Sequence, residues 1–191
     1  MQKSGLVSLA IPYCDFREDK KKDLRGLLSS VLFQLSNQSD SYHSILSDFY
    51  STHLYGARSP GDDELVHCFF DMLRHPGSQP VYLIVDALDE CPGTCSSSSP
   101  REKLLSLLEG LVGAQLPNLR ICVTSRTEVD IKTILGPLAL PSISLQNESG
   151  QKEDIKNYIE SFVNANKKMK NWNQRFRQLV IEVLSEKADG M

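Results

Sequence analysis

The fold prediction rests on residues 81–90, which are VYLIVDALDE. Five consecutive apolar residues follow Gln79 and Pro80, and three carboxylates then appear within five positions. A short apolar run bounded by chain-breaking residues is typical of a strand buried on both faces of a parallel sheet. Ligands of open parallel sheets bind beyond the carboxyl ends of the strands. The sequence therefore predicts that Asp86 lies where a ligand would bind, with Glu90 on the loop above it.

A second buried strand is predicted at residues 119–124, which are LRICVT, and it ends at Ser125 and Arg126. Between the two strands, Ser99 followed by Pro100 and Glu102 marks the start of a helix that ends near Gly113. The order strand, helix, strand predicts a parallel pair joined by a right-handed crossover. Arg126 should therefore lie at the same edge of the sheet as Asp86.

The remaining segments predict further helices and strands and a second domain. Residues 5–14 form an apolar stretch predicted as a strand, and leucines at helical spacing predict a helix over about 19–37. A last short strand is expected over 142–146. The pattern is helical beyond this point, so we predict an α/β domain over 1–147, with helices on both faces of its sheet, and a partial helical domain over 148–191.

The composition of the 191 residues is that of an ordinary globular protein, with 40% apolar and 24% charged residues. A net charge of −3 gives no reason to expect nucleic acid or an acidic membrane as a partner. Five irregularly spaced cysteines suit a reducing compartment, so we expect a cytoplasmic protein. Zinc binding at Cys91 and Cys95 would need two more ligands nearby, so two thiols in a loop are favoured there.

The carboxylates after the first buried strand have two interpretations. An Asp at the end of a buried strand commonly holds a hydrated magnesium ion beside phosphate groups, and a second acid can orient an attacking water. The simpler interpretation is that the strand ends in a solvated acidic turn. Arg126 likewise either contacts a phosphate, for which its guanidinium fork is suited, or bridges to Asp89 and Glu90 with no nucleotide present.

Four segments together resemble the NACHT-type domain of the nephrocystin-3-like N-terminal family, a group of signal-transduction P-loop NTPases. They are DFR at 15–17, DLRGLLSS at 23–30, DALDEC at 86–91 and ICVTSR at 121–126. The resemblance covers nearly the whole chain and implies a helical lid after the nucleotide domain. It implies that Asp86 holds Mg²⁺, that Glu90, or Asp89 as second choice, orients the attacking water, and that Arg126 contacts the terminal phosphate of ATP or GTP.

The phosphate cradle of such enzymes is missing from the sequence. None of the eleven glycines is followed by lysine, so the motif Gly-x-x-x-x-Gly-Lys-Ser/Thr is absent. The resemblance places the P-loop strand between the strands that end at Asp86 and Arg126. We therefore expect that the sheet has an unfilled slot there or has closed up. We also expect poor nucleotide affinity, and that the chain is a fragment or a degenerate copy.

Two functions follow from these observations. The first is a signal-transduction NTPase module that retains the acidic box and the sensor arginine, with weak or no hydrolysis by this chain alone. The alternative is a non-enzymatic interaction module of the same fold. It would act through protein partners or self-association, using its exposed sheet or helices.

Overall fold

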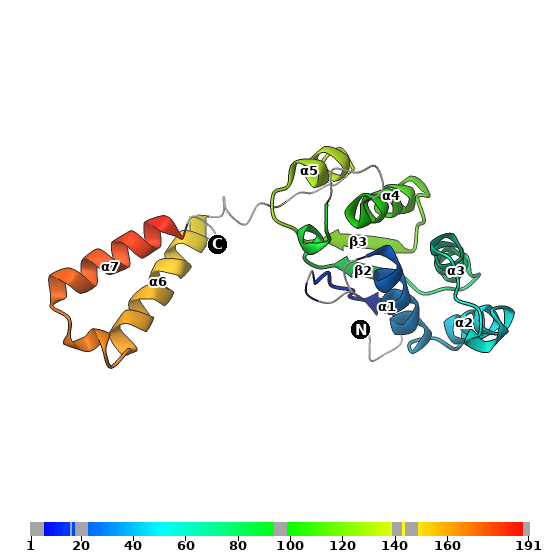
Figure 1. Cartoon of the computed structure of the whole chain (residues 1–191), viewed down its shortest axis with the longest axis horizontal. Coiled ribbons are helices and arrows are strands. Elements are labelled where there is room, and N and C mark those ends of the chain that lie inside the picture. The colour runs from blue at the N-terminus through cyan, green and yellow to red at the C-terminus, as the bar shows by residue number, and fades with distance from the viewer. Residues whose placement is uncertain are drawn as a thin grey trace. The chain divides into compact units, whose positions relative to one another are not determined.

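The computed structural model describes residues 6–15, 17, 23–93, 99–138, 143 and 149–188. The chain folds as two compact units, Met1–Ala139 and Leu140–Met191, called here the α/β unit and the helical unit. Figure 1 shows the elements of each unit. The predicted boundary at residue 147 falls outside the described residues, and so does the strand predicted over 142–146 apart from Ile143. Both stay predictions.

The described strands of the α/β unit form one parallel sheet, in the order β1-β2-β3. Their bounds are Ser8–Ala10 for β1, Val81–Val85 for β2 and Leu119–Val123 for β3. An isolated parallel bridge between Tyr13 and Asp86 extends the contact of β1 with the end of β2. The predicted α/β class and the predicted parallel pair are confirmed.

Strands β2 and β3 are direct neighbours, so of the two expectations for this position, an unfilled slot or a closed-up sheet, the unfilled slot is wrong. Val81 pairs with Leu119 and Val85 pairs with Val123 in one unbroken register. The backbone N–H of Val81 donates to the carbonyl of Asn118 at 2.7 Å, and that of Thr124 donates to Val85 at 2.9 Å. Hydrogen-bonded strands lie about 4.8 Å apart, which leaves no room for another strand. The sheet is closed up at this position.

Among the described residues of this unit, α-helices connect and follow the strands. They are α1 (Leu24–Ser36), α2 (Asp40–Thr52), α3 (Asp62–Arg74), α4 (Pro100–Gly113) and α5 (Val129–Leu135). The side chain of Asp23 accepts a hydrogen bond from the Gly26 N–H at 2.8 Å, so α1 begins at Leu24 rather than near residue 19. Ser99 caps α4 through the Glu102 N–H at 3.1 Å, as the sequence predicts.

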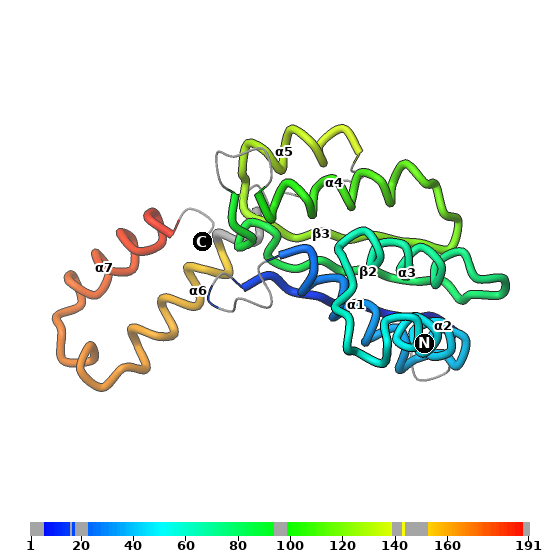
Figure 2. Tube along the Cα trace, turned by 45° about the vertical axis from the view of Figure 1, so that its right-hand side comes forward, coloured from blue at the N-terminus to red at the C-terminus, as the bar shows by residue number. Residues whose placement is uncertain are grey.

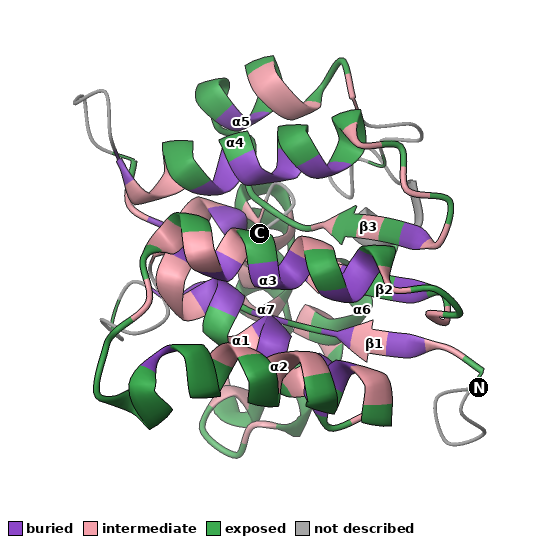
Figure 3. Cartoon of the chain, turned by 90° about the vertical axis from the view of Figure 1, so that its right-hand side faces the viewer, coloured by how far each residue is buried: buried purple, intermediate pink, exposed green. Residues whose placement is uncertain are grey.

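The core lies on one side of the sheet. Val81, Leu83 and Val85 are buried and share one cluster with residues of α1, α3, α4 and α5, whereas Tyr82 is 44% exposed. Figure 3 shows buried stretches of these helices and strands in purple. The prediction of burial on both faces is therefore wrong for the side that carries Tyr82. Both crossovers step in the same direction, from β1 to β2 and from β2 to β3. Right-handed connections that step in one direction place their helices on the same face.

Two glutamine side chains bond the outer edge of β1. Gln38, in the turn after α1, accepts from the Leu9 N–H at 2.9 Å and donates to the Leu9 carbonyl at 2.7 Å. Gln34 bonds the N–H and carbonyl of Ile11 in the same way, at 2.8 and 3.3 Å. These two side chains replace a neighbouring strand, so the edge of β1 is blocked against pairing with another chain.

The helical unit is a hairpin of α6 (Ser149–Ala165) and α7 (Gln174–Lys187), joined through a short 3-10 turn at Met169–Asn171. The trace in Figure 2 shows α7 returning along α6. The two predicted C-terminal helices are thus present. Among the described residues, no helix combines the length and the apolar character needed to cross a bilayer.

The glutamine bridges predict a stability difference between two matched variants. We expect Gln38→Leu to lower the free energy of unfolding by about 1–3 kcal/mol, because it leaves part-buried backbone groups of Leu9 without partners. Gln34→Leu should cost less, because its hydrogen bonds to Ile11 are exposed to water. Urea unfolding of both variants measures the difference. Equal losses would contradict the burial of the Leu9 backbone groups as the cause of the difference. No loss in either variant would show that the bridges do not support the edge of β1.

Candidate functional site

Asp86 and Thr124 directly follow two neighbouring strands and meet at the carboxyl edge of the sheet. The Thr124 hydroxyl donates to Asp86 Oδ1 at 2.5 Å, and its oxygen accepts from the Ala87 N–H at 3.0 Å. One hydroxyl therefore orients the carboxylate and fixes the backbone that follows it. The contact exists because the register of β2 and β3 ends both strands at the same level.

The chain turns sharply immediately after Asp86. Ala87 has φ 54° and ψ 48°, a left-handed conformation that is unusual for a residue with a side chain. A 3-10 turn at Leu88–Glu90 follows, and the Leu88 N–H donates to the Thr124 carbonyl at 3.0 Å. Leu88 is fully buried, and its burial keeps Asp89 and Glu90 on the loop above the strand end. Backbone strain of this kind is frequent at functional sites.

Arg126 lies against Asp89, so the sheet edge joins the predicted arginine to the acidic loop. Asp89 Oδ1 accepts from the Arg126 N–H at 2.9 Å, and Asp89 Oδ2 lies 3.6 Å from Arg126 Nε. The Arg126 side chain is 85% exposed, whereas that of Asp89 is only 10% exposed. The bridge that the sequence analysis gave as one alternative is therefore present, and the guanidinium remains accessible to solvent.

The carboxylates of this edge act on the buried thiol of Cys14. A hydrogen bond between the thiols of Cys14 and Cys91 lowers the pKa of Cys14 and raises the pKa of Cys91. Burial and the negative charges of Asp89, Glu90 and Asp86 act in the opposite direction on Cys14. Arg126 and Arg101 offset part of this negative charge.

Arg101 is an important residue of this region that the sequence analysis did not identify. Its Nε donates to the Cys91 carbonyl at 2.8 Å and its Nη2 to the Asp89 carbonyl at 2.7 Å. Its Nη1 also bonds the Asp130 carboxylate of α5, at 3.2 and 3.3 Å. Only 12% of the Arg101 side chain is exposed. A positive charge in the first turn of a helix opposes the helix dipole. The unusual position of Arg101, two residues after the predicted helix start at Ser99, was the sequence feature that could have identified it.

The acidic edge has too few side-chain ligands to hold a magnesium ion without phosphates. Within the described ranges, no group of three or more His, Cys, Asp or Glu side chains could hold a metal ion. Magnesium, however, usually keeps several waters and binds through one or two carboxylates together with substrate phosphates. Asp86 is exposed and oriented by Thr124, which suits a ligand of this kind. The residues fit a metal that arrives with phosphates, and not a metal held by the protein alone.

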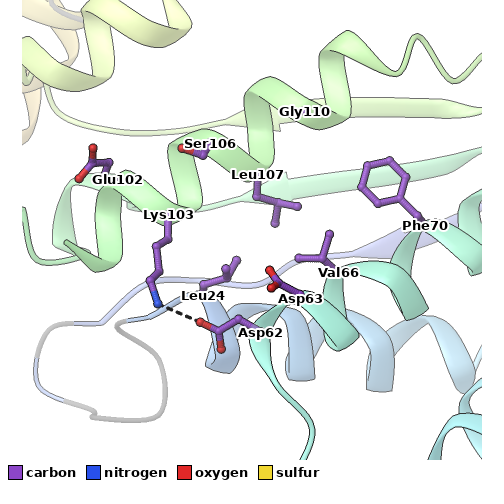
Figure 4. A pocket seen from close by; sticks show the side chains of 10 residues that line it. All are labelled: Leu24, Asp62, Asp63, Val66, Phe70, Glu102, Lys103, Ser106, Leu107 and Gly110. Atoms are coloured by element: carbon purple, nitrogen blue, oxygen red, sulfur yellow. Dashed lines mark hydrogen bonds and ion pairs between the residues drawn. The ribbon is translucent and has the colours of Figure 1, made fainter. Parts of the chain in front are cut away.

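A hollow of about 690 Å³ lies elsewhere, between α1, α3 and α4. Figure 4 shows its lining side chains, among them Val66, Phe70 and Leu107, with an ion pair of 3.0 Å between Lys103 and Asp62 at one side. None of the predicted site residues contributes to it. Because it contains no arrangement suited to phosphate, the candidate site remains the carboxyl edge of the sheet.

Comparison with known proteins identifies a family for this chain. A family model described as Nephrocystin 3, N-terminal matches residues 1–126. No curated protein and no solved structure matches the chain. The matched range contains β1, β2 and β3 and all four predicted site residues.

The Arg101 contacts predict that this side chain stabilises the acidic loop. We expect Arg101→Met to lower the free energy of unfolding by about 2–3 kcal/mol, because two backbone carbonyls and a carboxylate lose a charged donor. Lys103→Met is the matched control on the same helix. Its exposed ion pair with Asp62 should contribute less than about 1 kcal/mol. Thermal or urea unfolding that ranks the two variants in the opposite order would contradict this role.

The Thr124 hydroxyl gives a second prediction at this site. We expect Thr124→Val to lower the free energy of unfolding by about 1 kcal/mol, because valine keeps the branched shape but cannot bond Asp86 and Ala87. Thr124→Ser keeps the hydroxyl, so its free energy of unfolding should fall by less than that of Thr124→Val. If urea unfolding shows the serine variant to be the less stable of the two, the methyl group rather than the hydroxyl is what matters.

Proposed function

The chain belongs to the nephrocystin 3 N-terminal family, and from this premise we propose that its α/β unit is the phosphate-sensing part of a signal-transduction NTPase module. The observation that carries the proposal is the meeting of Asp86, Thr124, Asp89 and Arg126 at one edge, from two neighbouring strands. The ligand is a magnesium complex of ATP or GTP, and hydrolysis by this chain alone is weak or absent.

Asp86 is the residue that would hold the magnesium ion. Thr124 fixes the orientation of its carboxylate through Oδ1, and Oδ2 of the same group is the second oxygen available to a hydrated ion. Magnesium supplies positive charge that neutralises the phosphate oxygens. Glu90, or Asp89 as second choice, orients the water that attacks the terminal phosphate.

Arg126 would exchange its partner when nucleotide binds. In the structure its Nε lies 3.6 Å from a carboxylate oxygen of Asp89, in a largely exposed position where an ion pair is weak. A terminal phosphate carries more charge than a carboxylate and accepts two hydrogen bonds from a guanidinium. Transfer of Arg126 from Asp89 to the phosphate gives the module two states, which suits a switch rather than a metabolic enzyme.

The sequence also limits the strength of binding. A triphosphate in P-loop enzymes is held by a lysine and a nest of backbone N–H groups, and the motif that supplies them is absent from these 191 residues. Asp86 and Arg126 provide charge and two or three hydrogen bonds. We therefore expect affinity in the high micromolar to millimolar range.

Titration with a fluorescent ATP analogue and magnesium tests the proposal. We expect saturable, magnesium-dependent binding that Asp86→Asn weakens about tenfold or more, because a charged ligand is replaced by a neutral amide of equal size. Asp48→Asn on the exposed side of α2 is the matched control and should bind like the unchanged chain. Arg126→Gln should also weaken binding of the ATP analogue. The loss should be smallest for ADP, because ADP lacks the terminal phosphate that Arg126 would contact.

The absence of binding up to millimolar nucleotide, in chain shown to be folded by circular dichroism, would reject the proposal. It would favour the second candidate, an interaction module without nucleotide chemistry. A specific observation supports that candidate. The side of the sheet opposite the core carries the exposed apolar residues Ile11, Tyr13 and Tyr82, and a parallel sheet is normally covered there.

A further inference from the structure

The helical unit buries very little of its apolar surface. Among the residues of α6 and α7 whose side chains are described, only Val163 and Ile181 are buried. Six large apolar side chains are between 39% and 71% exposed: Tyr158, Phe162, Phe176, Leu179, Val183 and Leu184. A pair of helices with so small a seam needs further packing, because most helix stability in proteins comes from a covered apolar face.

Four of the six exposed apolar residues lie on one side of the hairpin. Tyr158 and Phe162 directly precede Ile159 and Val163 of α6, and Phe176 and Leu184 directly precede Arg177 and Ser185 of α7. The four residues that follow are buried or half-buried and form the seam. Leu179 and Val183 lie two positions on either side of the buried Ile181, so they continue the exposed face around the outside of α7. One position is about 100° of rotation around a helix. The two helices are antiparallel, so a step back by one residue rotates in opposite directions in space on α6 and on α7. Both steps therefore lead from the seam to the same side of the hairpin. Tyr158 stacks on Phe162, with ring centroids 6.4 Å apart.

The size of this face matches one half of a protein interface. The six exposed fractions correspond to roughly 500–600 Å² of apolar side chain, with about 200 Å² for a large aromatic residue. A standard interface buries about 800 Å² from each partner, of which somewhat more than half is apolar. The face is therefore large enough for a stable contact once its polar rim is included.

The charges along α7 indicate which partner fits this face. Arg175 and Arg177 lie in the first half of the helix, and Glu182, Glu186 and Lys187 lie in the second half. At about 100° of rotation per residue, Arg175 and Glu186 fall on the side of α7 that is turned away from the buried Ile181. A twofold axis near the middle of α7 would place Arg175 of one copy opposite Glu186 of the other, twice per dimer. The surface is thus complementary to itself in an antiparallel arrangement.

We propose that the exposed face of the α6–α7 hairpin binds a second copy of this chain, with α7 packed antiparallel on α7 and the two hairpins forming a four-helix bundle. Such bundles cover one apolar side of each helix and are joined by short loops, as α6 and α7 are. The opposed helix directions also pair the dipoles favourably. This contact is independent of nucleotide binding at the sheet edge.

Sedimentation equilibrium of the full chain over a range of micromolar concentrations tests this proposal. The unchanged chain should be a dimer, and Val183→Glu should make it monomeric, because the twofold axis brings two added charges into an apolar contact. Val112→Glu on α4 is the matched control, since Val112 is 38% exposed and Val183 is 39% exposed. That variant should remain dimeric.

A charge exchange tests the antiparallel register. Arg175→Glu or Glu186→Arg alone should weaken the dimer about tenfold, because each places like charges opposite one another twice. The double variant should recover the affinity of the unchanged chain. A monomer at all concentrations would overturn the proposal. So would a dimer that Val183→Glu leaves intact but Tyr82→Glu on the open side of the sheet disrupts. Recovery by the double variant would support it even if Val183→Glu failed to fold.

Discussion

The parallel hydrogen-bond ladder between β2 and β3 determines the geometry of the candidate site. Its register ends both strands at one level, so the hydroxyl of Thr124 reaches Asp86 and the backbone of Ala87. A slip of one residue would turn the side chains of β3 to the opposite face of the sheet. Thr124 would then point away from Asp86, and Leu119 would leave the core. One ladder thus sets both the packing and the polar contacts at the carboxyl edge.

Two arginines stabilise the acidic loop beyond this ladder in different ways. Arg101 is largely buried, bonds two backbone carbonyls and links the loop to α5 through Asp130. Arg126 is largely exposed and contacts the carboxylate of Asp89. Burial makes the contacts of Arg101 costly to break, whereas solvent weakens the ion pair of Arg126. The first arrangement holds the loop in place, and the second leaves a guanidinium able to change partners.

The two units differ in how completely they cover their apolar residues. The α/β unit gathers its helices on one side of the sheet around a single cluster and leaves Tyr82 and Ile11 exposed on the other side. The helical unit leaves most of its large apolar side chains exposed. Exposed apolar patches of contiguous residues often mark contact surfaces. The interaction module and the dimer proposed above would use these two surfaces.

The sequence by itself determined the α/β class, the parallel pair of strands and the position of Asp86 at a strand end. These features follow from local signals: apolar runs between breakers, the cap at Ser99 and the alternation of strand and helix. Only the tertiary structure decided that β2 and β3 are neighbours, that Tyr82 of β2 is exposed opposite the core, and that Arg101 supports the acidic loop. These depend on contacts between residues far apart in the chain. The order of strands fixes on which side successive right-handed crossovers place their helices, and no local pattern encodes that order.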